Sequence, residues 1–413
     1  MRFWRVYPLL WAVALLLVTA GCGDRQVSVP TPQMNAEEEF WVRVLLEKDL
    51  RRCILHIGSG FSVINPATED GERIFGAGSA PIEVRMTAGR IIVASESYDW
   101  QEVVISPEEP CIFELNGRSY RGKLKLVVNS AGESFDAINI LPIEPYLAGV
   151  VGAEMPQYWE PAALEAQTIA ARTYCLYIKD RFGGGRNWDV RRTQANQVYL
   201  GLGGESAQIW SVVDSTCGRV LMCEQADGSK GIFPSYYSSV CGGHTEDSSN
   251  VFGDSFEPLR GSVCDYCKEV ARPGFFFWPM VKVAKSVVTE RLFARYPRLR
   301  ELGDVKDIVA ARVSDYGTFR RITSFKLVGS NGKTGFLRAE DLRLCIDPSG
   351  ARIRSTSFEL ADMGSEWAFL SGRGYGHSVG MCQCGAQGLA RRGKSAEEIL
   401  EYYYPGAEIV SLY

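Results

Sequence analysis

The sequence predicts an α+β fold, in which a sheet-rich N-terminal lobe packs against a mixed helical core. Between residues 39 and 139, short segments rich in valine, isoleucine and phenylalanine alternate with glycine, proline and asparagine turns, a pattern typical of strands. After residue 140 the apolar residues recur with helical spacing instead. This change of period predicts a boundary between the two parts.

The composition is that of an ordinary globular protein. Of the 413 residues, 46% are hydrophobic and 23% are charged, so the chain can bury one large core or two smaller ones. The formal net charge is -4. This charge argues against nucleic acid as a partner, because binding to phosphates requires an excess of basic side chains.

The N-terminus has the layout of a secretory signal. Arg2 and Arg5 precede an apolar run over residues 9–18, and small residues then lead to Cys22. We expect residues 1–22 to be a lipoprotein signal peptide and Cys22 to be lipidated after cleavage. The alternative is a signal anchor in which Cys22 is an ordinary cysteine. Either way, the chain is expected to be exported and held at a bacterial membrane in the cell envelope.

Residues 23–38 are polar and contain prolines, which predicts a flexible tether before the folded body. In the lobe over residues 39–139, the clearest strand candidates are RIIVAS, EVVIS and KLKLVVN.

The region from residue 140 to 413 begins with two predicted helices. The first contains Pro145 in its opening turn and ends before Pro156. The second covers residues 161–182, is rich in alanine, and stops at a run of three glycines. Beyond it, we expect strands near residues 197–200 and 219–222, a helix near residues 286–296, and a strand at ITSFKLVG.

Glu154 is the most informative residue in the chain. Together with Leu147, Val150 and Val151 it falls at i, i+3, i+4 and i+7, so a carboxylate occupies the apolar stripe of the first helix. Burial and the C-terminal end of the helix dipole should both raise its pKa. A raised pKa suits a general acid that works near neutral pH. The alternative is a buried ion pair with Arg172, which would tie the two helices together.

Two long segments resemble a known family. YLAGVVGAEMPQYWEPAALEAQTIAARTY resembles the signature of the stage II sporulation protein D family, which includes proteins described as amidase enhancers. GRGYGHSVGMCQCGAQGLARRGKSAEEILEYYYPGAEI resembles its closing motif, and LRAEDLRLCIDPSGARIRSTSFEL resembles the lead-in to that motif. The resemblance covers nearly everything after residue 38, and it implies that residues 140–413 form a catalytic core.

Sporulation members of this family are lytic transglycosylases, which cut the peptidoglycan bond between N-acetylmuramic acid and N-acetylglucosamine and leave a 1,6-anhydro end. The resemblance places their catalytic carboxylate on Glu154, in AEMP. Glu154 would protonate the leaving oxygen and then accept a proton from the sugar's 6-hydroxyl. One carboxylate suffices when that hydroxyl attacks the anomeric carbon, whereas a hydrolase commonly needs two. The implied chemistry requires no cofactor.

Six further residues are candidates for contacts with a glycan. Gln167 and Arg172 lie on the second helix, and the others lie in polar, glycine-flanked motifs: Tyr237, Ser238, His377 and Gln383. The glycines around His377 give close backbone access, which favours a place in a cleft over a core position. For Arg172 an equal alternative is a structural role, in which it tethers Glu154 or a helix end.

Cysteine and histidine spacing predicts a structural site in the loop 236–270. Cys241 and His244 form C-x-x-H, and Cys264 and Cys267 form C-x-x-C, a set compatible with tetrahedral zinc. Four protein ligands would leave no position for water, so a zinc ion would only stabilise the loop. In an exported protein, disulfides among the three cysteines are an equal alternative.

The cysteine pattern departs from that of the family. Some members bind zinc just before the strand that reads QVYLG here, but the preceding VRRTQAN contains no cysteine or histidine, so that site is not carried over. Cys382 and Cys384 stand where serine and tyrosine are usual, and Ser378 replaces a common glycine. The C-x-C pair could be a strained disulfide, halves of two bridges, or buried thiols. Cys217 and Cys223 could staple a hairpin.

The leading hypothesis is a lytic transglycosylase of peptidoglycan strands, with a cell-wall amidase as a partner that removes stem peptides first. The alternative is a non-catalytic peptidoglycan-binding protein that recruits or stimulates an amidase. A zinc hydrolase is disfavoured, because four ligands close the coordination sphere of the metal.

Overall fold

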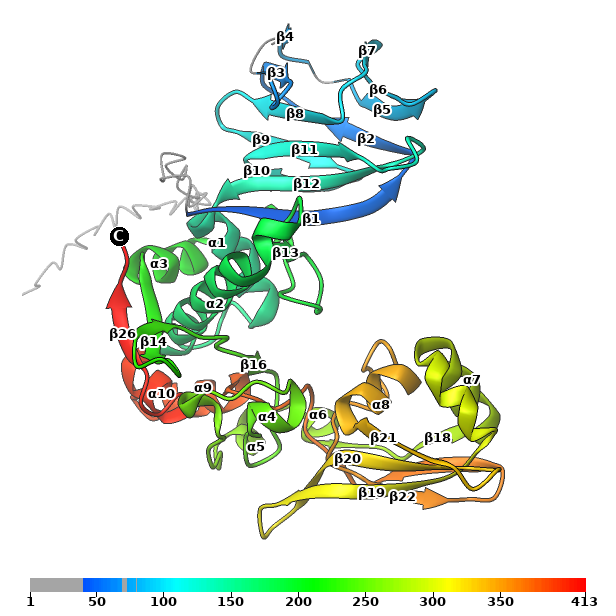
Figure 1. Ribbon diagram of the computed structural model, residues 1–413. Coiled ribbons are helices and arrows are strands. Elements are labelled where there is room, and N and C mark those ends of the chain that lie inside the picture. The colour runs from blue at the N-terminus through cyan, green and yellow to red at the C-terminus, as the bar shows by residue number, and fades with distance from the viewer. Residues whose placement is uncertain (1–39, 69–72, 79) are drawn as a thin grey trace, which may run out of the picture.

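The computed structural model describes residues 40–68, 73–78 and 80–413. The predicted signal peptide, the tether and Cys22 lie outside these residues. Helices and strands are both abundant, so the predicted α+β fold is confirmed. Figure 1 shows three bodies: a lobe of strands, a helical core, and a second mixed body at the far end.

The N-terminal lobe is built of two sheets. Its strands are β1 (Trp41–Leu50), β2 (Arg52–His56), β3 (Phe61–Ile64), β4 (Arg73–Phe75), β5 (Ile82–Thr87), β6 (Arg90–Val93), β7 (Glu96–Tyr98), β8 (Glu102–Pro107), β9 (Ile112–Leu115), β10 (Arg118–Arg121), β11 (Lys123–Val128), β12 (Phe135–Pro142) and β13 (Val190–Arg191). Within the described residues, one sheet has the order β13-β1-β12-β11-β8-β3-β4 and the other β10-β9-β2-β5-β6-β7. Burial alternates along β8 and β11, as expected where one face of a strand covers a core. The three predicted strand segments are β6, β8 and β11.

The lobe and the helical core share one hydrophobic cluster. The chain passes from β12 directly into α1 (Ile143–Glu154), and β13, which follows the second helix, pairs in parallel with β1. Arg43 in β1 forms an ion pair of 2.7 Å with the buried Asp189 beside β13. The predicted packing of the lobe on the helical core is therefore present.

Helix α2 (Pro161–Phe182) is the centre of the helical core and has the predicted bounds. Pro161 opens it, and the three glycines that follow form the short turn η2 (Gly183–Gly185). Residues 166–176 are all buried, because other helices pack around them. The other elements of this core are η3 (Gly201–Gly204), α3 (Ala207–Ser215), β14 (Arg219–Glu224), β15 (Lys230–Ile232), α9 (Gln383–Ala390), α10 (Ala396–Tyr403) and β26 (Glu408–Ser411).

The predicted strand near residues 219–222 is β14, but the one predicted near residues 197–200 is wrong. The backbone hydrogen bonds of that segment go elsewhere, since Val198 N–H donates to the Glu154 side chain and Leu200 N–H donates to the carbonyl of Gly149. The segment is therefore extended along α1 and is not paired in a sheet.

A second hydrophobic cluster lies between residues 278 and 369, within the region that was predicted to form a single core over residues 140–413. Its elements are β17 (Phe277–Trp278), β18 (Val281–Ala284), α7 (Lys285–Arg295), η5 (Pro297–Leu302), β19 (Val305–Asp315), β20 (Arg320–Gly329), β21 (Thr334–Arg338), α8 (Ala339–Ile346), β22 (Glu359–Asp362), β23 (Glu366–Leu370) and β24 (Gly372–Arg373). β17 pairs with β24, so the chain enters and leaves this body side by side. The predicted helix near residues 286–296 is α7, and ITSFKLVG lies in β20.

Two distant motifs meet where the bodies join. β16 (Tyr237–Ser238) and β25 (Met381–Cys382) pair in parallel, with Ser238 opposite Cys382. The segment between β16 and β17 contains α4 (Ser248–Val251), η4 (Glu257–Leu259), α5 (Cys267–Val270) and α6 (Pro273–Phe276). Each helix in the described part of the chain is too short or too polar to cross a bilayer.

Candidate active site

Glu154 is the last residue of α1. The predicted apolar stripe is present, because three residues on the same helix face are fully buried: Leu147, Val150 and Val151. The carboxylate therefore continues an apolar face to the point where the helix ends.

Two hydrogen bonds hold the Glu154 carboxylate. Val198 N–H donates to Oε1 at 2.8 Å, and Gln383 Nε2 donates to Oε2 at 3.4 Å. Burial raises the pKa of Glu154, and the two hydrogen bonds only partly oppose this effect. The carboxyl group is therefore biased toward its protonated form.

Arg172 does not pair with Glu154. Its buried guanidinium donates to the two carboxylate oxygens of Glu144 at 2.9 Å and 2.6 Å, and to the carbonyl of Arg219 at 3.0 Å. The alternative of an ion pair for Glu154 is therefore wrong. Arg172 is fully buried, so its role is the structural one, in which it joins α2 to the first turn of α1, and not contact with a ligand.

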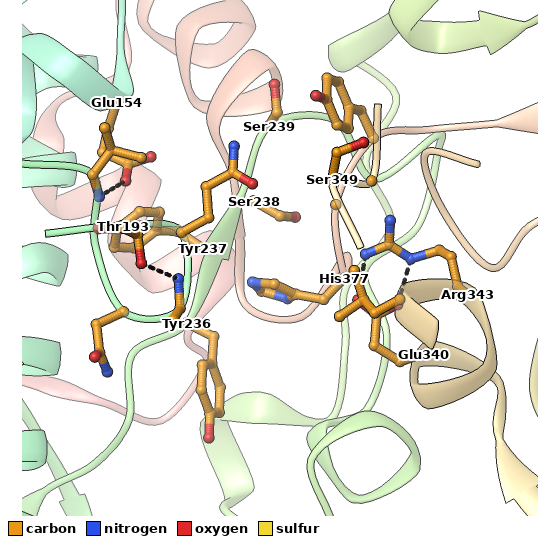
Figure 2. Close-up of a pocket in the computed structure, with 18 of the residues that line it drawn as sticks. Glu154, Thr193, Tyr236, Tyr237, Ser238, Ser239, Glu340, Arg343, Ser349 and His377 are labelled. Carbon is orange, nitrogen blue, oxygen red and sulfur yellow. Dashed lines mark hydrogen bonds and ion pairs between the residues drawn. The ribbon is translucent and has the colours of Figure 1, made fainter. Parts of the chain in front are cut away.

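A cavity of about 850 Å³ lies beside Glu154, where the helical core faces the second mixed body (Figure 2). This volume is in the range of small-molecule sites. From the helical core the lining includes Glu154, Asn196, Tyr237, Ser238 and Gln383. From the second body it includes Arg295, Glu340, Arg343 and Ser349.

Four of the six predicted contact residues line this cavity: Tyr237, Ser238, His377 and Gln383. Ser238 Oγ is buried and has no hydrogen-bond partner among the described residues, so it can bond a ligand without losing another bond. Gln167 is fully buried and lies behind the lining, where its Oε1 accepts from Gln383 Nε2 at 3.4 Å. Gln167 can therefore orient Gln383 but does not itself face the cavity.

His377 is uncharged in the cavity wall. Burial lowers its pKa to about 4, although Glu340 opposes this effect. Val379 N–H donates to Nδ1 at 3.0 Å, which leaves the ring proton on Nε2. His377 can therefore act as a neutral hydrogen-bond donor.

Nuclear magnetic resonance should show the His377 ring titrating at about pH 4 and not near the usual value of about 6.5. The chain has three histidines, so a His377→Asn variant assigns the signal. Because the folded state favours the neutral ring, the free energy of unfolding should fall as the pH drops from about 6.5 toward about 4. A midpoint near the usual value would mean that the ring is solvated.

The cavity contains a second carboxylate, Glu340, which is already paired. Its two oxygens accept from Arg343 at 2.5 Å and 2.9 Å. Burial alone would raise the pKa of Glu340, but Arg343 outweighs burial and holds the pKa below its usual value. Glu340 therefore stays ionised, and Glu154 is the carboxyl group suited to donate a proton.

Two parts of the site were not predicted from the sequence. Gln197 donates to the Tyr237 hydroxyl and accepts from that of Tyr146, both at 2.9 Å, and it thereby fixes the loop whose next residue bonds Glu154. The sequence signal that could have identified Gln197 is a polar residue at the start of the otherwise apolar segment QVYLG. Glu340 and Arg343 lie in a segment that contributed only to the family resemblance.

The predicted metal loop forms a cluster of four cysteines, and His244 is not among them. The cluster is buried and its Sγ atoms all lie within 4.8 Å of one another: Cys241, Cys264, Cys267 and Cys382. The Nδ1 of His244 lies 2.6 Å from the carbonyl oxygen of Thr245, and its ring stacks on Tyr316. The prediction of His244 as a ligand is therefore wrong. The fourth side chain of the cluster is Cys382, which the pairing of β16 with β25 brings to the loop.

The cysteines of the described residues are all free thiols. The predicted staple between Cys217 and Cys223 is absent, since both cysteines are free. Strand β14 begins at Arg219, and its stretch from Arg219 to Cys223 alone spans about 13 Å, whereas a disulfide needs its Cα atoms within about 7 Å. Cys384 is a buried thiol next to the cluster, and so the C-x-C pair forms no strained disulfide.

Comparisons with known proteins agree with this arrangement. The family model described as stage II sporulation protein matches residues 131–223, which include α1 and α2. An uncharacterised protein of Brachyspira hyodysenteriae is 31% identical over 301 residues, which cover 72% of this chain and 74% of that protein. Stage II sporulation protein D of Bacillus subtilis is 28% identical over 299 residues, or 68% of this chain and 78% of that protein. The amidase enhancer of Bacillus subtilis is 27% identical over 337 residues, or 72% of this chain and 45% of that protein. The chain belongs to the stage II sporulation protein D family.

Proposed function

We propose that the protein is a peptidoglycan lytic transglycosylase that cleaves the bond between N-acetylmuramic acid and N-acetylglucosamine, with Glu154 as general acid and base. The observation that carries this proposal is the contrast between the two carboxylates of the cavity. Burial raises the pKa of Glu154, while Arg343 keeps Glu340 ionised. A site with one group able to donate a proton suits a reaction that needs one carboxyl group.

Glu154 acts twice in this reaction. Its proton passes to the glycosidic oxygen while the bond from that oxygen to C1 of N-acetylmuramic acid breaks. The 6-hydroxyl oxygen of the same sugar then bonds to C1, and its proton returns to the Glu154 carboxylate. No water is consumed, so no second carboxylate is needed to activate one. The Ser238 hydroxyl, which has no hydrogen-bond partner among the described residues, is available as a donor to the sugar.

The same proposal includes the location of the protein. The signal layout before Cys22 supports export and attachment to a membrane through a lipid on that cysteine. The folded body would then reach the peptidoglycan of the envelope through the tether.

A second candidate is an amidase enhancer that binds peptidoglycan without cutting it. The match to the amidase enhancer of Bacillus subtilis favours it, because the aligned region covers 72% of this chain. In that case a cell-wall amidase would be the direct partner of the protein.

Digestion of purified glycan strands separates the two candidates. With strands from which an amidase has removed the stem peptides, we expect mass spectrometry to detect products that are lighter by one water than hydrolytic fragments. Strands that keep their peptides should be cut more slowly. Binding without any anhydro product, together with faster turnover of an added amidase, would favour the second candidate.

The rate of cleavage should fall as the pH rises through the raised pKa of Glu154, because only the protonated carboxyl can donate. The hydrogen bond from Gln383 lowers this pKa. A Gln383→Leu variant should therefore move the alkaline limb of the kcat/KM profile to higher pH. The matched control is Gln208→Leu, which changes an exposed glutamine of α3. An alkaline limb that stays in place, or moves to lower pH, would contradict the role of Gln383.

A further inference from the structure

We infer that the four-cysteine cluster is a structural zinc site that holds one wall of the cavity in place. A tetrahedral zinc ion with Zn–S bonds of about 2.3 Å sets its sulfurs about 3.8 Å apart. The Sγ atoms of Cys241 and Cys267 lie 3.9 Å apart, and all four Sγ atoms lie within 4.8 Å of one another. A disulfide would require an S–S distance of about 2.05 Å.

Hydrogen-bond donors surround the sulfurs as they do in metal thiolate sites. The backbone N–H of Cys241 donates to Cys382 Sγ at 3.3 Å, and that of Gly243 donates to Cys241 Sγ at 3.4 Å. The hydroxyl of Tyr403 lies 3.1 Å from Cys264 Sγ. Donors of this kind stabilise negative sulfur and fix the orientation of the ligands.

Two arginines supply positive charge beside the cluster. Four thiolates outweigh the charge of Zn²⁺ by two, and such an excess is costly to bury without compensation. Arg321 is buried and donates to the carbonyls of Cys241 at 2.6 Å and His244 at 3.0 Å. Arg373 donates to the carbonyl of the residue after Cys241. Arg321 also forms an ion pair with the buried Glu246, at 3.5 Å, so that carboxylate offsets part of the charge of Arg321.

The sequence positions of the ligands indicate what the metal would hold. Cys382 pairs with Ser238 across the β16–β25 ladder, and it directly precedes Gln383, which bonds Glu154. Cys264 and Cys267 bring a loop from another part of the chain. With four cysteine ligands the coordination sphere is closed, so the metal would not activate water. Its role would be to fasten the strands that carry Ser238 and Gln383.

Metal content tests the inference independently of glycan cleavage. The full chain is purified without oxidants, with zinc sulfate as the only added metal salt. Plasma mass spectrometry should then find one zinc ion per protein chain. Cys382→Ser should lose this zinc. His244→Ala and the matched control Cys384→Ser, which changes a buried cysteine two positions further on, should keep it. Loss in His244→Ala together with retention in Cys382→Ser would overturn the ligand set.

A second measurement needs no variant, in case Cys382→Ser fails to fold. The unaltered chain loaded with cobalt should show thiolate-to-cobalt charge-transfer absorption of the intensity given by four thiolates. The intensity of three thiolates would overturn the inference. A metal-free chain whose intact mass shows that the four cysteines have lost their hydrogens to disulfides would overturn it as well.

Discussion

Replacing Glu154 with glutamine should lower the rate of anhydro-product formation by about 10²–10⁴-fold, which is the usual contribution of a general acid or base. The amide keeps the length of the side chain, and its oxygen can still accept from Val198 N–H. The variant should therefore bind glycan strands normally and lose kcat while KM changes little. Initial rates measured by chromatography and mass spectrometry of the released ends provide the check.

The matched control for this variant is Glu160→Gln. Glu160 is an exposed glutamate just before α2, and its side chain makes no capping hydrogen bond. The Glu160→Gln variant carries the same chemical change at an exposed position. Its rate of anhydro-product formation should therefore equal that of the unaltered protein. If Glu154→Gln turned over as fast as this control, Glu154 could not be the general acid.

The same pair of variants should differ in stability. Because burial raises the pKa of Glu154, the ionised carboxylate destabilises the folded state at neutral pH. Glu154→Gln should therefore have a larger free energy of unfolding than the unaltered protein at pH 7. This gain in the free energy of unfolding should vanish below the ordinary carboxyl pKa of about 4, where Glu154 is protonated in both the folded and the unfolded state.

Replacing Arg172 with methionine should lower the free energy of unfolding by about 3–5 kcal/mol, the cost of removing one partner of a buried ion pair. The reason is that Glu144, whose side chain is 17% exposed, would lose the guanidinium at 2.6 Å. Denaturant unfolding provides the measurement. Arg181→Met, an exposed arginine on the same helix, is the matched control and should be close to neutral.

A double variant shows whether the pair is the cause. Adding Glu144→Gln to Arg172→Met removes the unpaired charge, so part of the lost stability should return. An Arg172→Met variant with normal stability but poor activity would contradict the structural role of Arg172. It would favour the alternative, in which Arg172 contacts the substrate.

The sequence was most informative where the controlling interactions are local. Helix α2 has the predicted bounds because Pro161 and the three glycines after it fix its ends within the chain itself. Glu154 could be singled out because a carboxylate on an apolar helix face is anomalous whatever packs against it. The strands of the lobe could be located because short runs rich in valine, isoleucine and phenylalanine lie between turn residues.

The remaining features depend on contacts that spacing does not encode. Cys241 and Cys382 are 141 residues apart, so a search for short ligand spacings favoured His244 in place of Cys382. The segment 197–200 has the composition of a strand, yet α1 and the Glu154 side chain take its backbone hydrogen bonds. The sequence pattern offered Glu154 or a helix end as the partner of Arg172, and only the packing of the helices shows that it bonds Glu144.

Digestion of denuded glycan strands in heavy-oxygen water tests the proposed lytic cleavage most directly. We predict that the new ends are 1,6-anhydro sugars without the label, because the 6-hydroxyl oxygen attacks C1 and no water enters the product. Reducing ends that carry the heavy oxygen would contradict the proposed mechanism, because they would show that water attacks C1.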